Sequence, residues 1–383
     1  MREYIFTSES VTEGHPDKIA DQISDAILDY IIERDINARV ACETIVTNGI
    51  CLVTGELKTS IYAPIQDIAR DVIREIGYTD ASFGFDYRSA GVLNAIGEQS
   101  IDINQGVDKS SGELGAGDQG FMFGYASSET KELMPLPITL AHKLTKKLAE
   151  VRKNGTLPFL RPDGKAQITI RYRGDTPIAV DNIVISAQHD ENISLDILRD
   201  SIITEVIETT ISKELLSGET KFYINPTGRF VIGGPQADAG LSGRKIIMDS
   251  YGGSCPHGGG SFSGKDPTKM DRSGAYMARY IAKNLVGAGI SSRVSVQLAY
   301  AIGVSHPISV MIDTHSNNID NKKVVNMVKD MFDLTPLGII KTLNLLRPIY
   351  RKTAVYGHFG REEKGFSWER LDRVDEIKSY LKL

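Results

Sequence analysis

The sequence predicts an α+β fold in which three similar domains of mixed sheet and helices are related by pseudo-threefold symmetry. The chain has 383 residues, well beyond the ~150 residues of an average domain, so two or three cores are expected. An order of helix, strand, strand and helix recurs three times along the chain. These three units cover most of the sequence and leave little over.

The first unit opens with a helix over about residues 16–33. Its apolar residues recur at every fourth position, the spacing of one buried helical stripe: Ile19, Ile23, Ile27 and Ile31. A hairpin follows, because β-branched residues flank Asn48-Gly49, a dipeptide typical of a two-residue turn. A second helix is expected over about residues 65–76.

The predicted hairpin also places two carboxylates. With a two-residue turn at Asn48-Gly49, Glu43 faces Thr54, so Glu56 lies diagonally beside Glu43 on the same face, ~7–8 Å away. On a solvent face this pair would have no function. On the wall of a pocket it would bind a cation or an amino group.

The same order of elements returns twice. In the middle of the chain the predicted helix, strands and helix cover about residues 139–153, 166–172, 178–187 and 194–212. In the last third they cover about residues 271–286, 293–302, 308–314 and 322–332. The predicted domains are therefore 1–101, 121–230 and 231–383, with a separate segment at 102–120. A further strand is expected at 245–250.

The segment between the first two domains has a composition of its own. Residues 97–120 are polar and rich in glycine, with little apolar periodicity. Irregular loops longer than ~15 residues in a compact protein are usually functional or disordered. This segment is a candidate lid.

Composition excludes several classes of protein. A formal charge of -5 argues against binding nucleic acid through a basic surface. We find no signal-peptide core and no apolar run long enough to cross a bilayer, so a cytoplasmic protein without membrane contact is predicted. The cysteines Cys42, Cys51 and Cys255 form no C-x-x-C pair, which fits a reducing compartment and argues against structural zinc. Cys51 should face Val46 across the hairpin and so should not meet Cys42.

The first candidate phosphate site is Gly14-His15-Pro16-Asp17-Lys18. Proline fixes the first turn of a helix there, and the free backbone N–H groups and the helix dipole favour an anion. In the alternative interpretation, Asp17 only favours the helix start.

The second candidate is the glycine-rich segment from His257 to Asp271. Residues 259–265 fit G-x-x-x-x-G-K, but Asp266 stands where a P-loop has Ser or Thr. The predicted strand at 245–250 also does not run directly into the glycines. A phosphate cradle of another kind is therefore favoured over a true P-loop and over a plain glycine turn.

Several charged residues would complete a triphosphate site. The cations and the aromatic residue near these segments are Arg229, Phe230, Arg244, Lys245, Lys265 and Lys269. Asp17 and Asp271 would hold magnesium, since this ion takes oxygen ligands and commonly bridges carboxylates to phosphate. We find no H-E-x-x-H metal motif and no G-x-S-x-G nucleophile elbow.

Together these segments identify a family resemblance. From Phe6 to about Trp368 the chain resembles the S-adenosylmethionine synthetases, most specifically through G-H-P-D-K-I-A-D-Q-I-S-D-A, G-A-G-D-Q-G and H-G-G-G-S-F-S-G-K-D. The resemblance implies synthesis of S-adenosylmethionine by attack of the methionine sulfur on C5′ of ATP. Hydrolysis of the triphosphate to pyrophosphate and phosphate would follow.

The resemblance also implies roles for individual residues. Those expected to contact the polyphosphate and carry catalysis are His15, Lys165, Arg244, Lys245 and Lys265, with Asp118 as a further catalytic residue. Those expected near ATP are also Asp163, Arg229, Phe230, Asp238 and Ser261. Those expected around methionine are Glu56, Gln99, Asp238 and Lys269. Asp17 and Asp271 would bind a pair of Mg²⁺ ions, and Glu43 would bind K⁺.

The family further implies a homodimer with shared active sites, assembled into a homotetramer, and a mobile loop at Gln99–Lys109. Departures between the motifs, at 109–114, around 254–256 and at 194–217, bear on kinetics and assembly only. Two rival functions use the same segments. A P-loop-like kinase or ATPase would transfer the γ-phosphate, and a nucleotide sensor would bind ATP without consuming it.

Overall fold

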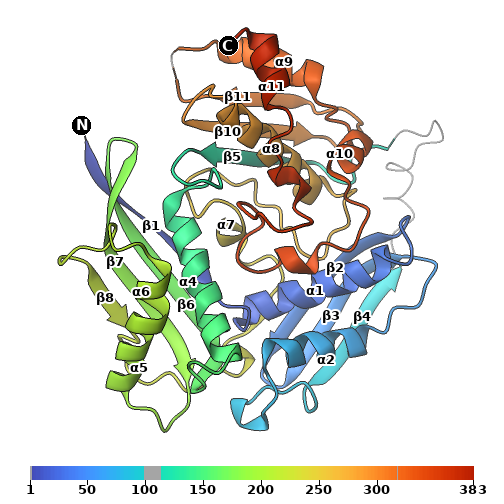
Figure 1. Cartoon of the computed structure of the whole chain (residues 1–383). Coiled ribbons are helices and arrows are strands. Elements are labelled where there is room, and N and C mark those ends of the chain that lie inside the picture. Colours follow the sequence, from blue (N-terminus) through green and yellow to red (C-terminus); the bar gives the residue numbers. More distant parts are fainter. Residues whose placement is uncertain (1, 99–113, 317) are drawn as a thin grey trace.

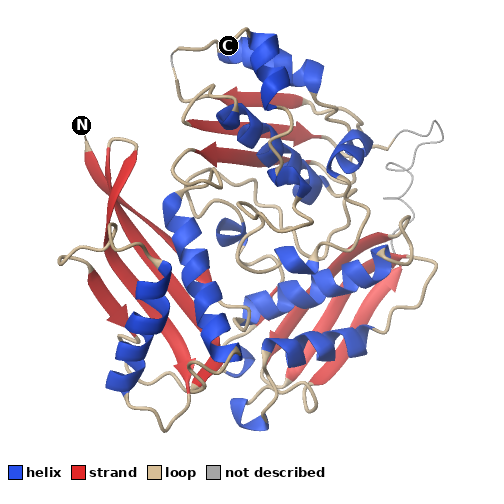
Figure 2. Ribbon diagram, in the orientation of Figure 1, coloured by secondary structure: helices blue, strands red, loops and turns tan. Residues whose placement is uncertain are grey.

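The computed structural model describes residues 2–98, 114–316 and 318–383. Three α+β domains surround a central group of loops and the short helix α7 (Figure 1). Helices cover one face of each sheet (Figure 2). The predicted fold class is confirmed.

The first domain contains α1 (Pro16–Ile32), β2 (Arg39–Thr47), β3 (Ile50–Lys58), α2 (Ile65–Ile76) and β4 (Gly91–Glu98). The central domain contains α4 (Leu136–Lys153), β6 (Leu160–Arg173), β7 (Thr176–His189), α5 (Leu195–Ile202), α6 (Glu208–Thr210) and β8 (Lys221–Ile224). A π-helical turn, Ile203–Ile207, joins α5 to α6. The third contains α7 (Ile246–Asp249), α8 (Met270–Gly287), β10 (Arg293–Tyr300), β11 (Ser309–Asp313), α9 (Asn321–Met331), α10 (Pro336–Leu343) and α11 (Val374–Leu381).

Three further strands interlock the domains. β1 (Glu3–Val11) precedes α1 but pairs with β6 of the central sheet, and β5 (Gly120–Ser127) precedes α4 but pairs with β10. β9 (Gly240–Leu241) precedes α7 and α8 but pairs with β2. Each domain therefore gives a strand to another: the first to the central, the central to the third, and the third to the first. These exchanges connect the predicted ranges 1–101, 121–230 and 231–383. Each exchange pairs a sheet edge that would otherwise be open.

The structure contains several elements that local sequence patterns predicted. The four isoleucines of the α1 stripe are fully buried: Ile19, Ile23, Ile27 and Ile31. Each contributes about 1.5–3 kcal/mol through apolar burial. In the hairpin, Thr47 pairs with Ile50 and Val46 with Cys51, so the predicted register is confirmed.

One predicted element is wrong. Residues 245–250 do not form a strand, because the Asp249 N–H donates to the carbonyl of Lys245 and closes the single helical turn α7. This turn directs the Asp249 carboxylate into the interior, where it binds Lys18. A local apolar pattern could not show that long-range partner.

The apolar core has two parts. One lies in the central domain between its helices and the strands β6 and β7, and the other runs continuously through the first and third domains. Among the described residues, no helix is both long and apolar enough to cross a membrane.

Candidate functional site

The N-terminus of α1 carries the first cluster of predicted residues. His15 is the N-cap, and its Nδ1 accepts from the N–H of Asp17 at 3.2 Å. Asp17 accepts from Lys245 Nζ at 2.5 Å and from the N–H of Leu241 at 3.0 Å. The guanidinium of Arg244 lies 3.9 Å from the same carboxylate. The structure thus brings together residues from the first and third domains.

The protonation states in this cluster follow from burial and charge. Burial, aided by Lys245 and Lys165, lowers the pKa of His15 to about 3, so its ring is neutral at pH 7. Because Nδ1 accepts a hydrogen bond, the ring proton lies on Nε2. Burial raises the pKa of Asp17, but the hydrogen bonds from Lys245 and Leu241 outweigh it and leave the pKa below its ordinary value.

A cavity adjoins this cluster. Its volume is about 400 Å³, and Arg244 and Lys245 line it together with Glu9 of β1 and Gln167 of β6. Lys165 lies two residues before Gln167, opposite Val11, and therefore points to the same face of β6. Three cations thus approach one hollow between two domains.

Asp163 lies beside these residues at the start of β6. Its Oδ2 accepts from the N–H of Gly234 at 2.8 Å, while its buried Oδ1 has no hydrogen-bond partner within the described part of the chain. Burial raises the pKa of Asp163 to about 6. Buried carboxylate oxygens normally accept a hydrogen bond, so Oδ1 is a candidate acceptor.

Two further residues predicted near ATP, Phe230 and Asp238, lie around Asp163. The N–H of Phe230 donates to His189 Nε2, and the exposed Asp238 donates its N–H to the carbonyl of Gly234. Arg229 lies farther out, in an exposed ion pair with Glu191.

The glycine-rich segment forms the second cluster. It runs beside β2, where the N–H of Cys42 donates to the carbonyl of Gly264 and Ala41 bridges to Lys265. Gly264 has φ +79°, and a Cβ there would lie 1.8 Å from the Cys42 carbonyl oxygen. Only glycine fits this approach. The segment delivers Lys265 Nζ to Asp271 at 2.6 Å.

Three other predicted residues lie close to this second cluster. Lys269 pairs with Asp266 at 2.6 Å and is largely covered. Ser261 contacts Gly243, since a Cβ at Gly243 would lie 2.5 Å from the Ser261 Cβ. The exposed Asp118 lies between Gly117, which packs against Thr268, and Gly120, which packs against Asp271.

The predicted carboxylate pair has the expected register. Glu43 faces Thr54 and Glu56 faces Ala41, the residue that also bridges to Lys265. Glu56 therefore lies beside the second cluster and is half-buried, whereas Glu43, two residues along β2, is exposed. Gln99 and the predicted mobile loop Gln99–Lys109 lie outside the described residues.

Sequence reasoning missed a row of aspartates on α1, although its spacing was visible. Asp17, Asp21, Asp25 and Asp29 recur at every fourth residue, as the isoleucines do. Each accepts a backbone N–H from a distant loop: Leu241, Gly243, Gly264, and Tyr350 with Arg351. This row aligns the loops that carry both clusters along one helix.

The two clusters remain apart within one chain. Asp25, which holds Gly264, is eight residues beyond Asp17, or roughly 12 Å along the helix. Asp17 and Asp271 are therefore held in separate ion pairs. Among residues 2–98, 114–316 and 318–383, no group of three His, Cys, Asp or Glu side chains could hold a metal.

Matches to known proteins extend over nearly the whole chain. Family models for the N-terminal, central and C-terminal domains of S-adenosylmethionine synthetase match residues 3–101, 113–230 and 232–370. The chain is 67% identical over 383 residues to the S-adenosylmethionine synthase of Sulfurovum sp., covering 100% of this chain and 99% of that protein. It is 62% identical over 380 residues to the S-adenosylmethionine synthase of Helicobacter pylori strain 26695, covering 99% of each.

Proposed function

The chain belongs to the S-adenosylmethionine synthetase family, and we propose that it joins L-methionine to the adenosyl group of ATP. The methionine sulfur attacks C5′ of the ribose, a C–S bond forms, and the C5′–O bond breaks. The triphosphate leaves with the electron pair of that bond, and the product is the sulfonium S-adenosylmethionine. A second step hydrolyses the triphosphate to pyrophosphate and phosphate.

The observation that carries this proposal is the gathering of cations and one neutral histidine around the N-terminus of α1. A thioether sulfur has no proton to lose, so the attack needs no general base. It needs orientation of the sulfur and stabilisation of the charge that develops on the triphosphate. Donors already held in place by Asp17, as Lys245 is, meet that requirement.

Each phosphate-binding residue has a definite role in this proposal. His15 stays neutral and donates from Nε2, while Lys165, Arg244 and Lys245 supply positive charge. Lys265, presented by the glycine turn at 264, stabilises the departing triphosphate. Asp163 Oδ1 accepts from the adenosine.

The chain offers oxygen ligands that suit the proposed cations. Asp17 and Asp271 each present one carboxylate paired with a lysine, and phosphate oxygens would complete the coordination of Mg²⁺. When bound, Mg²⁺ neutralises phosphate charge. The lysines Lys245 and Lys265 would then turn from these carboxylates to phosphate. Glu43, exposed on β2, is the proposed K⁺ ligand.

Methionine is proposed to bind near the second cluster. Glu56 on β3 would bind its amino group, with Gln99, Asp238 and Lys269 as further contacts. Lys269 is held by Asp266 and covered, so it meets methionine only if that ion pair opens. Asp118, between Gly117 and Gly120, is proposed as a catalytic residue beside Asp271.

The separation of the clusters supports an active site shared between two subunits. One chain would contribute the cluster with Asp17, and its partner the cluster with Lys265 and Asp271. The exposed apolar side chains on the sheets, including Ile50, Leu93 and Phe121, support burial of these faces in a homodimer. A homotetramer built from two such dimers is the proposed assembly.

The test uses purified full-length protein with ATP, methionine, Mg²⁺ and K⁺, and an isotope label in the γ-phosphate. We expect mass spectrometry to detect S-adenosylmethionine, with the label released as inorganic phosphate. A kinase would instead place the label on an acceptor, and a nucleotide sensor would leave ATP intact. Either of those outcomes rejects the proposal.

A further inference from the structure

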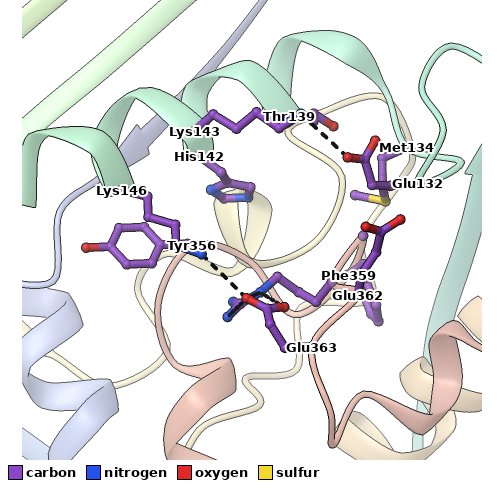
Figure 3. Close-up of a pocket in the computed structure, with 12 residues that line it drawn as sticks. Glu132, Met134, Thr139, His142, Lys143, Lys146, Tyr356, Phe359, Glu362 and Glu363 are labelled. Atoms are coloured by element: carbon purple, nitrogen blue, oxygen red, sulfur yellow. Dashed lines mark hydrogen bonds and ion pairs between the residues drawn. The ribbon is translucent and has the colours of Figure 1, made fainter. Parts of the chain in front are cut away.

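A second cavity lies between α4 of the central domain and the segment 356–363 (Figure 3). Its volume is about 400 Å³, within the range of roughly 300–1,000 Å³ that is usual for small-molecule sites. None of the residues proposed above for ATP, methionine or the metals lines it. A site of this kind has no role in the proposed reaction.

A buried histidine faces this cavity without a partner for one of its nitrogens. His142 of α4 is only 8% exposed, and its Nε2 has no hydrogen-bond partner among the described residues. Figure 3 shows its ring pointing from α4 toward the segment that carries Tyr356 and Glu363. Gly357 packs beside this nitrogen, and a side chain there would displace it, since a Cβ would lie 2.5 Å from Nε2. Such buried polar groups are normally satisfied.

The hydrogen bonds on the Nδ1 side of the His142 ring determine whether Nε2 is a hydrogen-bond donor or an acceptor. The Thr145 hydroxyl donates to the backbone carbonyls of Ala141 and His142, so it accepts from Ser10 Oγ at 3.0 Å. Ser10 Oγ then accepts from His142 Nδ1 at 2.9 Å. The ring proton lies on Nδ1, and Nε2 is a hydrogen-bond acceptor. Burial lowers the pKa of His142 to about 3, which keeps this nitrogen unprotonated at pH 7.

Two lysines on the same face of α4 can supply positive charge to an anionic group. Lys143 Nζ lies 3.5 Å from Glu132, and Lys146 Nζ lies 3.5 Å from Glu363. Both contacts are longer than the roughly 2.7–2.9 Å of a strong charge-assisted hydrogen bond. Both lysines are also half-exposed, so each can reach an anionic group in the cavity without leaving its glutamate. Arg361 cannot, because Glu363 and the carbonyls of Val355 and Gly357 already hold it.

Part of the remaining wall is apolar and aromatic, and the carboxylates of Glu132, Glu362 and Glu363 line the rest beside the lysines. Met134, Tyr356 and Phe359 form the apolar part, and Phe359 is fixed by stacking on Tyr251 with ring centroids 4.9 Å apart. A rigid aromatic wall favours an apolar or aromatic group. The cavity therefore combines an apolar wall, one unpartnered ring nitrogen, and a pair of lysines beside carboxylates.

We propose that this cavity binds an amino acid with an apolar side chain. Its amino group donates to His142 Nε2, and its carboxylate binds Lys143 and Lys146. The side chain packs against Met134, Tyr356 and Phe359. This site is independent of the proposed methionine and ATP sites.

L-phenylalanine is the probe that tests the proposal, by calorimetric titration of the full-length protein. We expect the Lys143→Ala/Lys146→Ala variant to bind about tenfold more weakly than the parent or worse. The matched control is Lys147→Ala/Lys153→Ala, which removes the same charge from α4 outside the cavity and should bind as the parent does. All the substituted lysines are at least partly exposed, so the variants should fold.

Two analogues of the probe test its two polar groups. Phenethylamine lacks the carboxylate and 3-phenylpropionate lacks the amine, and each should bind more weakly than L-phenylalanine. The proposal is overturned if the parent binds no L-phenylalanine at millimolar concentration. It is equally overturned if both double variants bind with parent affinity, which would place the probe elsewhere.

Discussion

Asp25 of α1 and Arg272 of α8 form a two-point ion pair that is completely buried. The distances are 2.7 Å from Nη1 to Oδ1 and 2.9 Å from Nη2 to Oδ2. The same Asp25 carboxylate accepts the N–H of Gly264 at 2.8 Å. One side chain thus joins the helices of two domains and holds the turn that presents Lys265.

This relationship predicts a large loss of stability when one partner is removed. Asp25→Asn should lower the free energy of unfolding by about 3–5 kcal/mol, because it leaves a buried guanidinium without its counter-charge. Chemical denaturation measures the change. Glu75→Gln, at the exposed pair with Arg351, is the control and should cost less than about 1 kcal/mol. Equal costs would mean that the buried pair adds nothing specific.

Gly264 should tolerate no side chain, because an added Cβ would clash with the backbone. Gly259 serves as a comparison, because it has a similar backbone conformation but open space around it. Gly259 has φ +95° with nothing within 4 Å of an added Cβ, whereas a Cβ at Gly264 would meet the carbonyl of Cys42. Gly259→Ala should therefore cost only the about 1–2 kcal/mol of a left-handed backbone. Gly264→Ala should cost more and also lower kcat, because it displaces Lys265. Unfolding curves and initial rates of both variants decide this, and similar behaviour would contradict it.

Lys265 should act mainly on the departing triphosphate. Lys265→Ala is expected to lower kcat by about two to three powers of ten, the usual effect of removing one preorganised donor, while methionine binding changes little. Lys265→Arg should rescue only in part, since a planar guanidinium does not replace a compact ammonium in a tight loop.

Single-turnover formation of S-adenosylmethionine, measured apart from hydrolysis of added triphosphate, tests this role. Transfer at the parent rate with saturating substrates would make Lys265 a binding or structural residue only.

Mixed dimers should reveal whether the two clusters serve one site. His15→Ala and Lys265→Ala subunits are each expected to have very little activity alone. With random pairing, half of the dimers are mixed and one of their two sites is intact, so about a quarter of the parent activity should return. Activity after subunit exchange is the measurement. No recovery in proven mixed dimers would place both residues in the same subunit's contribution.

His15 should make stability depend on pH in the acid range. Its pKa is about 3 in the folded chain and ~6.5 when unfolded, so between these values only the unfolded chain binds the proton. The stabilising effect of the neutral ring is complete above ~6.5 and is lost as the pH falls toward 3.

His15→Asn keeps an N-cap acceptor but removes this titration. The free energy of unfolding of the parent should rise with pH more steeply than that of the variant, by about 1.4 kcal/mol per pH unit between roughly pH 4.5 and 6. Denaturant titrations at several pH values measure the difference. Parallel curves would show that the pKa of His15 is the same in the folded and the unfolded protein.

The sequence alone determined the features that depend on short-range spacing. The isoleucine period fixed the buried face of α1, and Asn48-Gly49 fixed a register in which Glu43 faces Thr54. Pro16 and the glycines marked the two segments around which the charged residues gather. These predictions held because the residues that decide them lie within a few positions of each other.

Only the tertiary structure decided which distant groups meet. Residues 245–250 form a helical turn from which Asp249 reaches Lys18. Gly234 binds only one oxygen of Asp163, and the other has no partner among the described residues. The strand exchange and the loops held by the aspartates of α1 likewise join positions far apart in the chain. Such contacts depend on how whole domains pack, so no local period of the sequence encodes them.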